Sequence, residues 1–281
     1  MDATPPTGDA AGQAVRKLID GPGFNHLIEG RQGYVLFNAN DYYIGRCLAE
    51  YGEWSPGETD LFQRLVRPGH YVVDVGAHIG IHTLTFARLV GRQGKVFAFE
   101  PQRLLHQVLA ANVALNSLDN VHSHHMALGA KSGSVWLADN LDYSREANFG
   151  GVPLAAIARK PDDERPRYRL PIVRLDDFYD QPRLDFLKID VEGMEANVLQ
   201  GAERLIRTHR PILYVENDRA EKSRALVELL RSRGYRLRLH KPPLYSPTNY
   251  AGSRTDLFPG IVSCNLLCIH ESRATSSTSP R

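Results

Sequence analysis

The sequence predicts an α/β fold in which a parallel sheet is covered by helices on both faces. Two observations favour this fold. Short apolar runs that suit β-strands alternate with helix-like segments from Tyr71 onwards, which is typical of βαβ units. Acidic and amide residues directly follow several of these runs, where parallel strands carry ligand-binding groups at their carboxyl ends. The length of 281 residues suits one such domain with an appended N-terminal segment.

The charge balance indicates no strongly charged partner. The chain holds 34 Lys and Arg against 32 Asp and Glu, a net charge of +2, so we expect no binding of nucleic acid or acidic membranes through charge. Its three cysteines lack metal-finger spacing, which indicates reduced thiols. The first residues contain no apolar run, so neither a signal peptide nor a membrane anchor is expected. These features predict a cytoplasmic protein without a membrane span.

Composition divides the chain into four parts. They are a disordered N-terminus over 1–20, an N-terminal lid or substrate-side segment over 21–57, the main domain over 58–270 and a disordered tail over 271–281. The second part suits a lid or a short hairpin, and its Tyr43 and Trp54 suit the wall of a substrate pocket. Ordinary packing onto the core is the alternative for either side chain.

The first helix and strand of the main domain lead to a glycine-rich turn. Ser55 suits the N-cap of a helix that runs to Val66, and Tyr71–Val75 suits a buried strand. Gly76 and Gly80 follow at once. Glycine lets the backbone turn and lets a ligand approach it, and the next helix offers free N–H groups at its start. The pattern predicts a cofactor site.

Glu100 supports this prediction. It ends the next apolar run, Val96–Phe99, where a carboxylate can accept hydrogen bonds from ribose hydroxyls. The spacing from Gly76 to Gly80 lacks the middle glycine of the dinucleotide fingerprint, and the lysine and hydroxyl pair of a P-loop is absent. A nucleotide-dependent oxidoreductase stays as an alternative, whereas a glycine turn that binds nothing is disfavoured by Glu100.

The chain continues in βα units. The pattern predicts a helix over 103–116 and strands over 121–125, 133–138 and 170–174. Residues 139–169 lose periodicity and collect Asp, Arg, Pro and Gly. We therefore expect a long surface loop there, with Asn148 in it, that serves as a substrate flap.

A dense group of carboxylates follows the apolar strand predicted at 184–189. Asp190, Glu192 and Glu195 stand together before a helix predicted over 196–207. Acids at a helix start interact favourably with its dipole, which is the simpler explanation for Glu195. Asp190 instead closes a buried strand, so we expect it to take part in chemistry.

The strand predicted at 211–215 ends in the same manner, with Glu216 and Asn217. Carboxyl ends of parallel strands meet at one edge of a sheet, so these side chains are expected beside Asp190. The remaining predicted elements are a helix over 219–233, a strand over 235–239, an extended segment over 240–250 that begins with His240, and a strand over 263–269.

These motifs resemble those of the FkbM family of S-adenosylmethionine-dependent methyltransferases. The resemblance rests on residues 74–80, 99–101, 127–129 and 198–202, and above all on the run Lys188-Ile189-Asp190-Val191-Glu192-Gly193. It extends from about Asp41 through Cys268. It implies a class I methyltransferase fold, Rossmann-like, with a seven-stranded, mostly parallel sheet whose last strand is antiparallel. The activity it implies is methyl transfer, commonly to hydroxyls of sugars, lipids or secondary metabolites.

The resemblance also implies a set of cofactor contacts. Those assigned to S-adenosylmethionine are Asp74, Gly76, Ala77 and Gly80 for the methionine part, Glu100 for the ribose, and Met126 with Ala127 for the adenine. His78 and Pro101 are also expected at the cofactor site, and whether His78 contacts the methionine part or the substrate stays open. His78 departs from the family pattern, which usually has asparagine at this position.

The predicted reaction is O-methylation of a small neutral polyhydroxy molecule or a glycan. N-methylation of an amine or guanidine, and a non-catalytic scaffold that binds S-adenosylmethionine, are the alternatives. Whether the protein is a dimer stays open. The residues expected to contact the substrate are Tyr43, Trp54, Asn148, Glu216, Asn217 and His240.

An alcohol needs a base or a cation to lose its proton at neutral pH. Asp190 is the first candidate for the base, and Glu192 and His82 are further catalytic candidates. Asp190, Glu216 and Asn217 offer oxygen ligands of the kind that Mg²⁺ or Mn²⁺ prefers. A base without a metal is the favoured hypothesis and a divalent cation the alternative.

Overall fold

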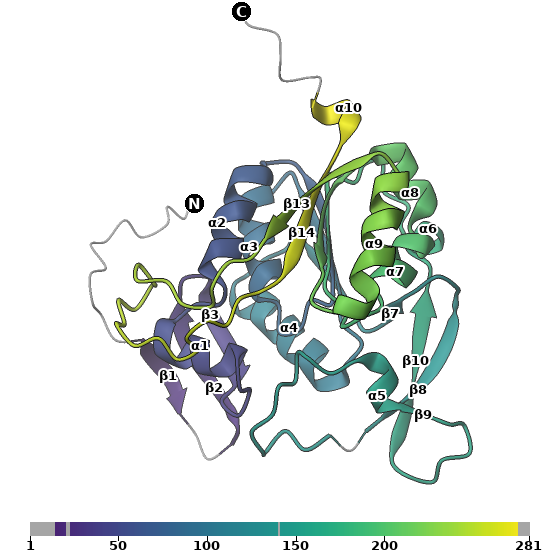
Figure 1. Cartoon of the computed structure of the whole chain (residues 1–281). Helices are drawn as coiled ribbons and strands as arrows, with labels where there is room; N and C mark the ends of the chain where they lie inside the picture. Colours follow the sequence, from purple (N-terminus) through teal and green to yellow (C-terminus); the bar gives the residue numbers. More distant parts are fainter. Residues whose placement is uncertain (1–14, 21–22, 140, 275–281) are drawn as a thin grey trace, which may run out of the picture.

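The structure, a computed structural model, describes residues 15–20, 23–139 and 141–274. Its centre is a seven-stranded sheet with the order β13-β14-β12-β11-β4-β5-β6 (Figure 1). The strands are β4 (Tyr71–Val75), β5 (Lys95–Phe99), β6 (Val121–His124), β11 (Phe186–Ile189), β12 (Ile212–Glu216), β13 (Tyr235–His240) and β14 (Asn265–His270). β14 is antiparallel to both of its neighbours, and the central pairs are parallel. The predicted α/β fold and its antiparallel last strand are confirmed.

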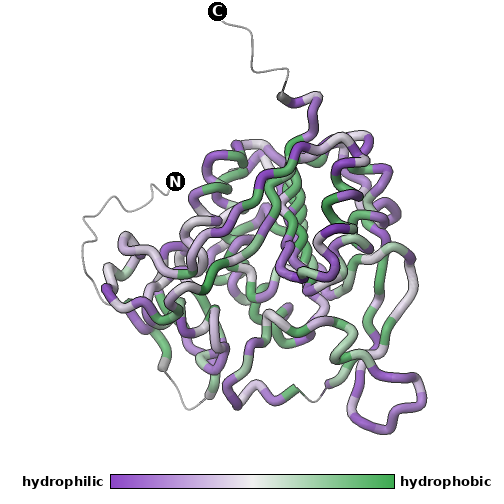
Figure 2. Tube along the Cα trace, in the orientation of Figure 1, coloured by the Kyte–Doolittle hydropathy of each residue, from purple (hydrophilic) through white to green (hydrophobic). Residues whose placement is uncertain are grey.

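Helices cover both faces of this sheet (Figure 1). On one face lie α2 (Pro56–Leu65), α3 (Ile81–Val90) and α4 (Arg103–Leu115), and on the other α7 (Glu195–Gly201), α8 (Glu203–His209) and α9 (Ala220–Ser232). Val72 of β4 packs with Phe62 and Phe86 on the first face, whereas Val73 packs with Leu199 and Leu230 on the second. Successive strand residues point to opposite faces, so strands buried on both sides are apolar throughout. Figure 2 shows this apolar colouring along the central strands.

A second, four-stranded sheet lies beside the main one, with the order β7-β10-β8-β9. Its strands are β7 (Ala127–Leu128), β8 (Gly133–Ala138), β9 (Ala158–Arg159) and β10 (Arg167–Val173), and the short helices α5 (Leu154–Ile157) and α6 (Leu175–Phe178) accompany it. The loop predicted over 139–169 is therefore wrong in part, because it contains α5, β9 and the start of β10. Segments of two to four residues are too short to show a period.

The N-terminal segment forms a third sheet, β1-β2-β3, followed by α1. The elements are β1 (Arg16–Asp20), β2 (Asn25–Gly30), β3 (Gly33–Asn38) and α1 (Ile44–Tyr51). The predicted hairpin is present as β2 and β3. The predicted disorder over 1–20 is wrong for 16–20, because β1 pairs with β2, and residues 1–14 lie outside the described residues.

Several predicted boundaries differ from those in the structure. The helix predicted over 196–207 is divided between α7 and α8 at Ala202. Ser55 lies at the start of α2 but has a left-handed φ of 43° and makes no side-chain capping hydrogen bond. The tail predicted from residue 271 begins with the short helix α10 (Glu271–Ala274), and 275–281 lie outside the described part. Among the described helices, none is both long and apolar enough to cross a membrane.

Candidate functional site

A cavity of about 260 Å³ lies at the carboxyl ends of β4, β5, β11 and β12. Residues directly after each of these strands line it, among them Gly76, Glu100, Asp190 and Asp218. Parallel strands that end at one edge leave their following loops to form a crevice, which is the usual ligand site of such sheets. The wall is completed by the N-terminal segment, the segment before α5 and the residues that precede β14.

The glycine turn brings two strand ends into contact. Gly76 has a φ of +74°, and a Cβ there would lie 1.7 Å from the carbonyl oxygen of Asp190. No other residue fits this position, because a side chain would displace the end of β11. The turn therefore sets the floor of the cavity and places Asp190 beside the loop that follows β4.

Glu100 lies on the cavity wall as predicted. Its Oε2 accepts a hydrogen bond from the backbone N–H of His78 at 2.9 Å, and its Oε1 accepts one from Gln102 at 2.8 Å. Burial raises the pKa of Glu100 to about 7. Each oxygen retains a second lone pair, so the carboxylate can accept further hydrogen bonds from ligand hydroxyls.

An apolar end of the cavity adjoins Glu100. The predicted residues Pro101, Met126 and Ala127 line it, together with Leu128 and Ile157. Flat apolar rings suit such a surface, because it removes their faces from water without an unpaired polar group.

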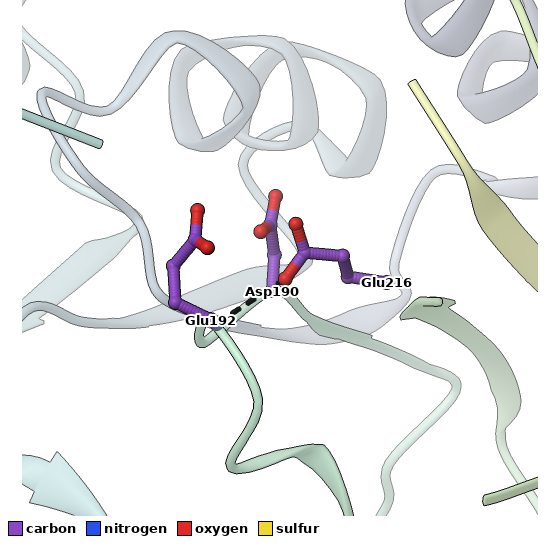
Figure 3. Close-up of side chains that lie close together, drawn as sticks. All are labelled: Asp190, Glu192 and Glu216. Atoms are coloured by element: carbon purple, nitrogen blue, oxygen red, sulfur yellow. Dashed lines mark hydrogen bonds between the residues drawn. The ribbon is translucent and has the colours of Figure 1, made fainter. Parts of the chain in front are cut away.

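Three of the carboxylates that line the cavity lie close together. They are Asp190, Glu192 and Glu216, and one carboxylate oxygen from each lies within 4.8 Å of one from each of the other two (Figure 3). The backbone N–H of Glu192 donates to Oε2 of Glu216 at 3.2 Å. The structure thus brings together the two strand ends that the sequence predicted to be neighbours.

The three carboxylates have different surroundings. The Nζ of Lys188 lies 3.2 Å from Oδ2 of Asp190, and Arg219 forms an ion pair with Glu192. Burial and the charge of Asp190 raise the pKa of Glu192 to about 7 and that of Glu216 to about 11. Glu216 therefore holds a proton at neutral pH, and Glu192 titrates near neutrality.

Two of the three residues predicted as metal ligands, Asp190 and Glu216, lie together with Glu192. The third, Asn217, is not among the cavity-lining residues, and its buried Oδ1 makes no hydrogen bond to the described residues. Lys188 and Arg219 place two positive charges beside the cluster, which weakens its attraction for a divalent cation.

The residues expected on the acceptor side fall into two groups. Tyr43, Trp54 and Asn148 line the cavity as predicted. His240 is not in the lining, and its Nδ1 lies 2.8 Å from the hydroxyl of Tyr214. The prolines that follow His240 turn the chain away, so strand position alone did not indicate where this ring points.

His82 does not line the cavity. Its Nε2 lies 2.9 Å from Oε2 of Glu58, and its ring packs edge-on against Phe62. The catalytic role expected for His82 stays a prediction that this position does not support.

Asp74, Ala77 and Gly80 form the framework of the turn rather than the cavity lining. Asp74 is fully buried, and its Oδ2 accepts a hydrogen bond from the Thr83 hydroxyl at 2.7 Å. Its Oδ1 lies 3.5 Å from the Nζ of Lys188. Asp74 therefore ties the turn to α3 and β11, and the direct cofactor contact expected for it stays a prediction.

Sequence reasoning missed Glu58, a buried carboxylate in the lining. It accepts hydrogen bonds from the Tyr214 hydroxyl at 3.1 Å and from the Asn265 amide at 2.7 Å. Burial raises its pKa, but His82 outweighs this effect and brings the pKa to about 2. Glu58 lies far from the other site residues in sequence, and no local pattern marks it.

Comparisons with known proteins agree with this geometry. The family model described as "Methyltransferase FkbM domain" matches residues 74–237. The chain is 26% identical over 150 residues to Methyltransferase 1 of Beauveria bassiana (strain ARSEF 2860), covering 47% of this chain and 58% of that protein. It is 29% identical over 159 residues to Methyltransferase sdnD of Sordaria araneosa, covering 47% and 60%.

A solved structure of methyltransferase FkbM from Methylobacillus flagellatus KT is 18% identical, covers 75% of this chain and 50% of that one, and has a TM-score of 0.46. The matches to the curated relatives span 58% and 60% of their length. The family match includes the glycine turn, Glu100 and the carboxylates after β11 and β12.

Proposed function

The chain belongs to the FkbM methyltransferase family, and on that premise we propose that it transfers a methyl group from S-adenosylmethionine to a hydroxyl of a small neutral molecule or glycan. One observation carries the proposal. A single cavity is lined by Gly76 of the glycine turn, by Glu100 and by three clustered carboxylates. These are the groups needed at one place for binding a nucleoside and for directing a hydroxyl.

The lining fits S-adenosylmethionine in three respects. The Gly76 turn leaves its backbone accessible, Glu100 offers lone pairs to the ribose hydroxyls, and the apolar end near Met126 and Ala127 suits the adenine. When bound, this cofactor supplies a methyl group that is open to attack by a nucleophile. The protein's own contribution is to hold the acceptor in line and to keep water away.

The carboxylate cluster is proposed to orient the acceptor and to take its proton. Asp190 forms an ion pair with Lys188 at 3.2 Å and accepts a hydrogen bond from a neighbouring hydroxyl of the acceptor. Glu192, with a pKa of about 7, takes the proton as the O–H bond breaks, since a base works best with a pKa near the working pH. Glu216 keeps its proton and donates a hydrogen bond.

We expect this chemistry to need no divalent cation, because Lys188 and Arg219 already pair with Asp190 and Glu192. Turnover should therefore be unchanged in EDTA. Loss of turnover in EDTA that magnesium or manganese restores would establish the metal-dependent alternative.

The acceptor is proposed to be uncharged rather than anionic. Six carboxylates and no Lys or Arg are found among the described residues of the lining. Phosphate groups of a nucleic acid would meet repulsion there. The same acidic lining also suits a protonated amine, so N-methylation is the second candidate function.

An acceptor screen tests the proposal. Purified protein is incubated with S-adenosylmethionine and, separately, with neutral glycosides, amino sugars, RNA and protein, and the formation of S-adenosylhomocysteine is measured. Product with neutral hydroxylated acceptors supports the proposal, and product with amines alone favours N-methylation. Product only with RNA or protein would contradict it, and cofactor binding without any turnover would indicate a scaffold.

A further inference from the structure

The cavity lacks an obvious partner for an anionic ligand group. Among its described lining residues are six carboxylates and no Lys or Arg. S-adenosylmethionine carries both an ammonium and a carboxylate on its amino-acid part. The carboxylates suit the ammonium, but the carboxylate of the ligand needs a donor or a cation. Among the described residues that line the cavity, His78 is the one whose side chain can become positively charged.

His78 occupies a conformation that a non-glycine residue rarely adopts. Its φ is 53°, in the left-handed region that costs free energy for any side chain and that clusters at ligand sites. Neither ring nitrogen makes a hydrogen bond to the described residues. A buried imidazole without hydrogen bonds is costly unless a ligand completes it.

A carboxylate stands on the far side of this ring. Oδ2 of Asp41 lies 3.6 Å from Nε2 of His78, while Oδ1 of Asp41 accepts a hydrogen bond from the backbone N–H of Ile44 at 2.8 Å, at the start of α1. Asp41 is buried and held by the backbone, so it is fixed in place. An imidazolium here would have one N–H directed toward Asp41 and the second nitrogen left for a ligand.

Other charged groups near His78 come from the remaining elements packed on it. Asp190, after β11, raises the pKa of His78, and Lys188 of β11 lowers it, whereas burial is the largest effect and lowers it. Glu100, after β5, accepts the backbone N–H of His78 at 2.9 Å. Gly150, from the segment before α5, lies against the ring without a charge.

We propose that His78 takes up a proton when the cofactor binds and pairs with the carboxylate of its amino-acid part, with Asp41 on the other side of the ring. This inference rests on the proposed use of S-adenosylmethionine and deepens it. Both ring nitrogens then have an anionic partner, which accounts for the unpartnered imidazole and for its strained backbone.

The charges around His78 determine how the affinity for the cofactor changes with pH. The pKa of His78 lies below its ordinary value in the free protein because of burial, and a second carboxylate beside the ring raises it in the complex. Binding therefore takes up a proton between these two pKa values. Affinity falls as the pH rises through this window, by up to about tenfold per pH unit.

Calorimetry tests the inference without a known acceptor. The affinities of S-adenosylhomocysteine and of 5′-methylthioadenosine, which lacks the amino-acid part, are measured between about pH 6 and about pH 8. Repetition in two buffers of different ionisation enthalpy gives the number of protons taken up. The variants are His78→Asn and, as a matched control, His270→Asn, whose ring lies at the far end of β14 from the cavity.

The wild type and His270→Asn should lose S-adenosylhomocysteine affinity as the pH rises and should take up close to one proton more than His78→Asn. Because Glu100 and Glu192 also have a pKa of about 7, the difference between wild type and His78→Asn isolates the histidine. For 5′-methylthioadenosine that difference should vanish.

An equal pH dependence in wild type and His78→Asn would overturn the inference, as would the same difference with 5′-methylthioadenosine. If neither ligand binds the folded wild type at any pH, the proposed function fails instead. Circular dichroism of His78→Asn verifies that the variant is folded, and binding of 5′-methylthioadenosine verifies that its nucleoside site is intact.

Discussion

Glu100 shows what a single residue does at this site. It holds the backbone of the turn through His78 and Gln102 and faces the cavity with its remaining lone pairs. Glu100→Ala should weaken S-adenosylhomocysteine binding by about tenfold to over a hundredfold, the effect of losing charge-assisted hydrogen bonds. Titration calorimetry measures this loss. Glu100→Gln, which keeps an acceptor oxygen of the same size, should lose less, and undiminished binding by Glu100→Ala would remove the assignment.

Glu216 links the same site to the pH dependence of stability. Its pKa is 4.5 in the ordinary case and about 11 in the folded protein, so its stabilising contribution is complete below pH 4.5 and is lost as the pH rises toward 11. Glutamine cannot ionise and avoids this loss. Glu216→Gln should therefore raise Tm relative to wild type by about 2 °C or more near pH 8, and by less near pH 5.

Thermal unfolding at the two pH values measures this difference. The exposed Glu221→Gln on α9 is the matched control, and its Tm should differ little from that of the wild type at either pH. If Glu216→Gln raises Tm by the same amount at both pH values, the buried, protonated state of Glu216 is contradicted.

At the residue scale, the sequence predicts which types of residue follow each strand but not where each side chain points. Asp190, Glu192 and Glu216 were predicted from their place at strand ends, and the structure assembles them. His82 pairs with Glu58 and packs on Phe62 outside the cavity lining, a placement that local sequence does not indicate. Glu58 was missed, because its partners Tyr214 and Asn265 are distant in sequence.

At the element scale, the turn after β4 depends on its close approach to β11. Gly76 and Gly69 both have positive φ, +74° and +80°, but a Cβ would collide with Asp190 only at Gly76, and nothing lies within 4 Å at Gly69. Gly69→Ala should cost about 1–2 kcal/mol of unfolding free energy from its backbone alone. Gly76→Ala should cost on the order of 4 kcal/mol or more.

Denaturant unfolding of the two glycine variants gives the comparison. Similar losses in both would show that the strand ends can separate at little cost, which would contradict the contact between the turn and Asp190. A much larger loss of unfolding free energy in Gly76→Ala than in Gly69→Ala would come from the contact with Asp190, because the backbone strain is common to both variants.

A buried amide contributes to the attachment of the N-terminal sheet to the main domain. Asn112 of α4 accepts from the Leu36 N–H at 2.6 Å and donates to the carbonyl oxygens of Leu36 at 2.9 Å and Ile79 at 2.8 Å. Asn112→Ala leaves these groups unpaired and should cost on the order of 2–4 kcal/mol.

Asn116 provides the control, because it makes a similar pair of bonds to Tyr34 at the exposed end of α4. Asn116→Ala should cost about 1 kcal/mol or less, since water can replace the amide. Chemical denaturation measures both variants, and equal losses would contradict the role given to the buried amide.

The predicted elements differ in how well the sequence marks them. β4, β5 and β12 begin and end within about two residues of the prediction, because burial on both faces makes them continuous apolar runs. β1 was not predicted, since its run Arg16–Asp20 alternates charged with apolar residues and needs the partner strand β2 to form. Likewise, β9 exists through its pairing with β8.

At the scale of the whole molecule, the sequence predicts an α/β fold with its ligand site at the carboxyl edge of the sheet. The fold is present, and a cavity lies at that edge. The number of strands and the antiparallel last strand came from the resemblance to the FkbM family, and the order of the strands was not predicted, since local patterns do not state which strands are neighbours. The cavity itself was not predictable in detail, because the N-terminal segment, the segment before α5 and the residues before β14 all contribute to its wall.

The central claim is that this cavity binds S-adenosylmethionine and not a nicotinamide dinucleotide. Calorimetric titration of the wild type with S-adenosylhomocysteine and, separately, with NAD⁺ tests it most directly. We predict saturable binding of one S-adenosylhomocysteine per chain and no binding of NAD⁺ at the same concentrations. Binding of NAD⁺ with no binding of S-adenosylhomocysteine would contradict the account.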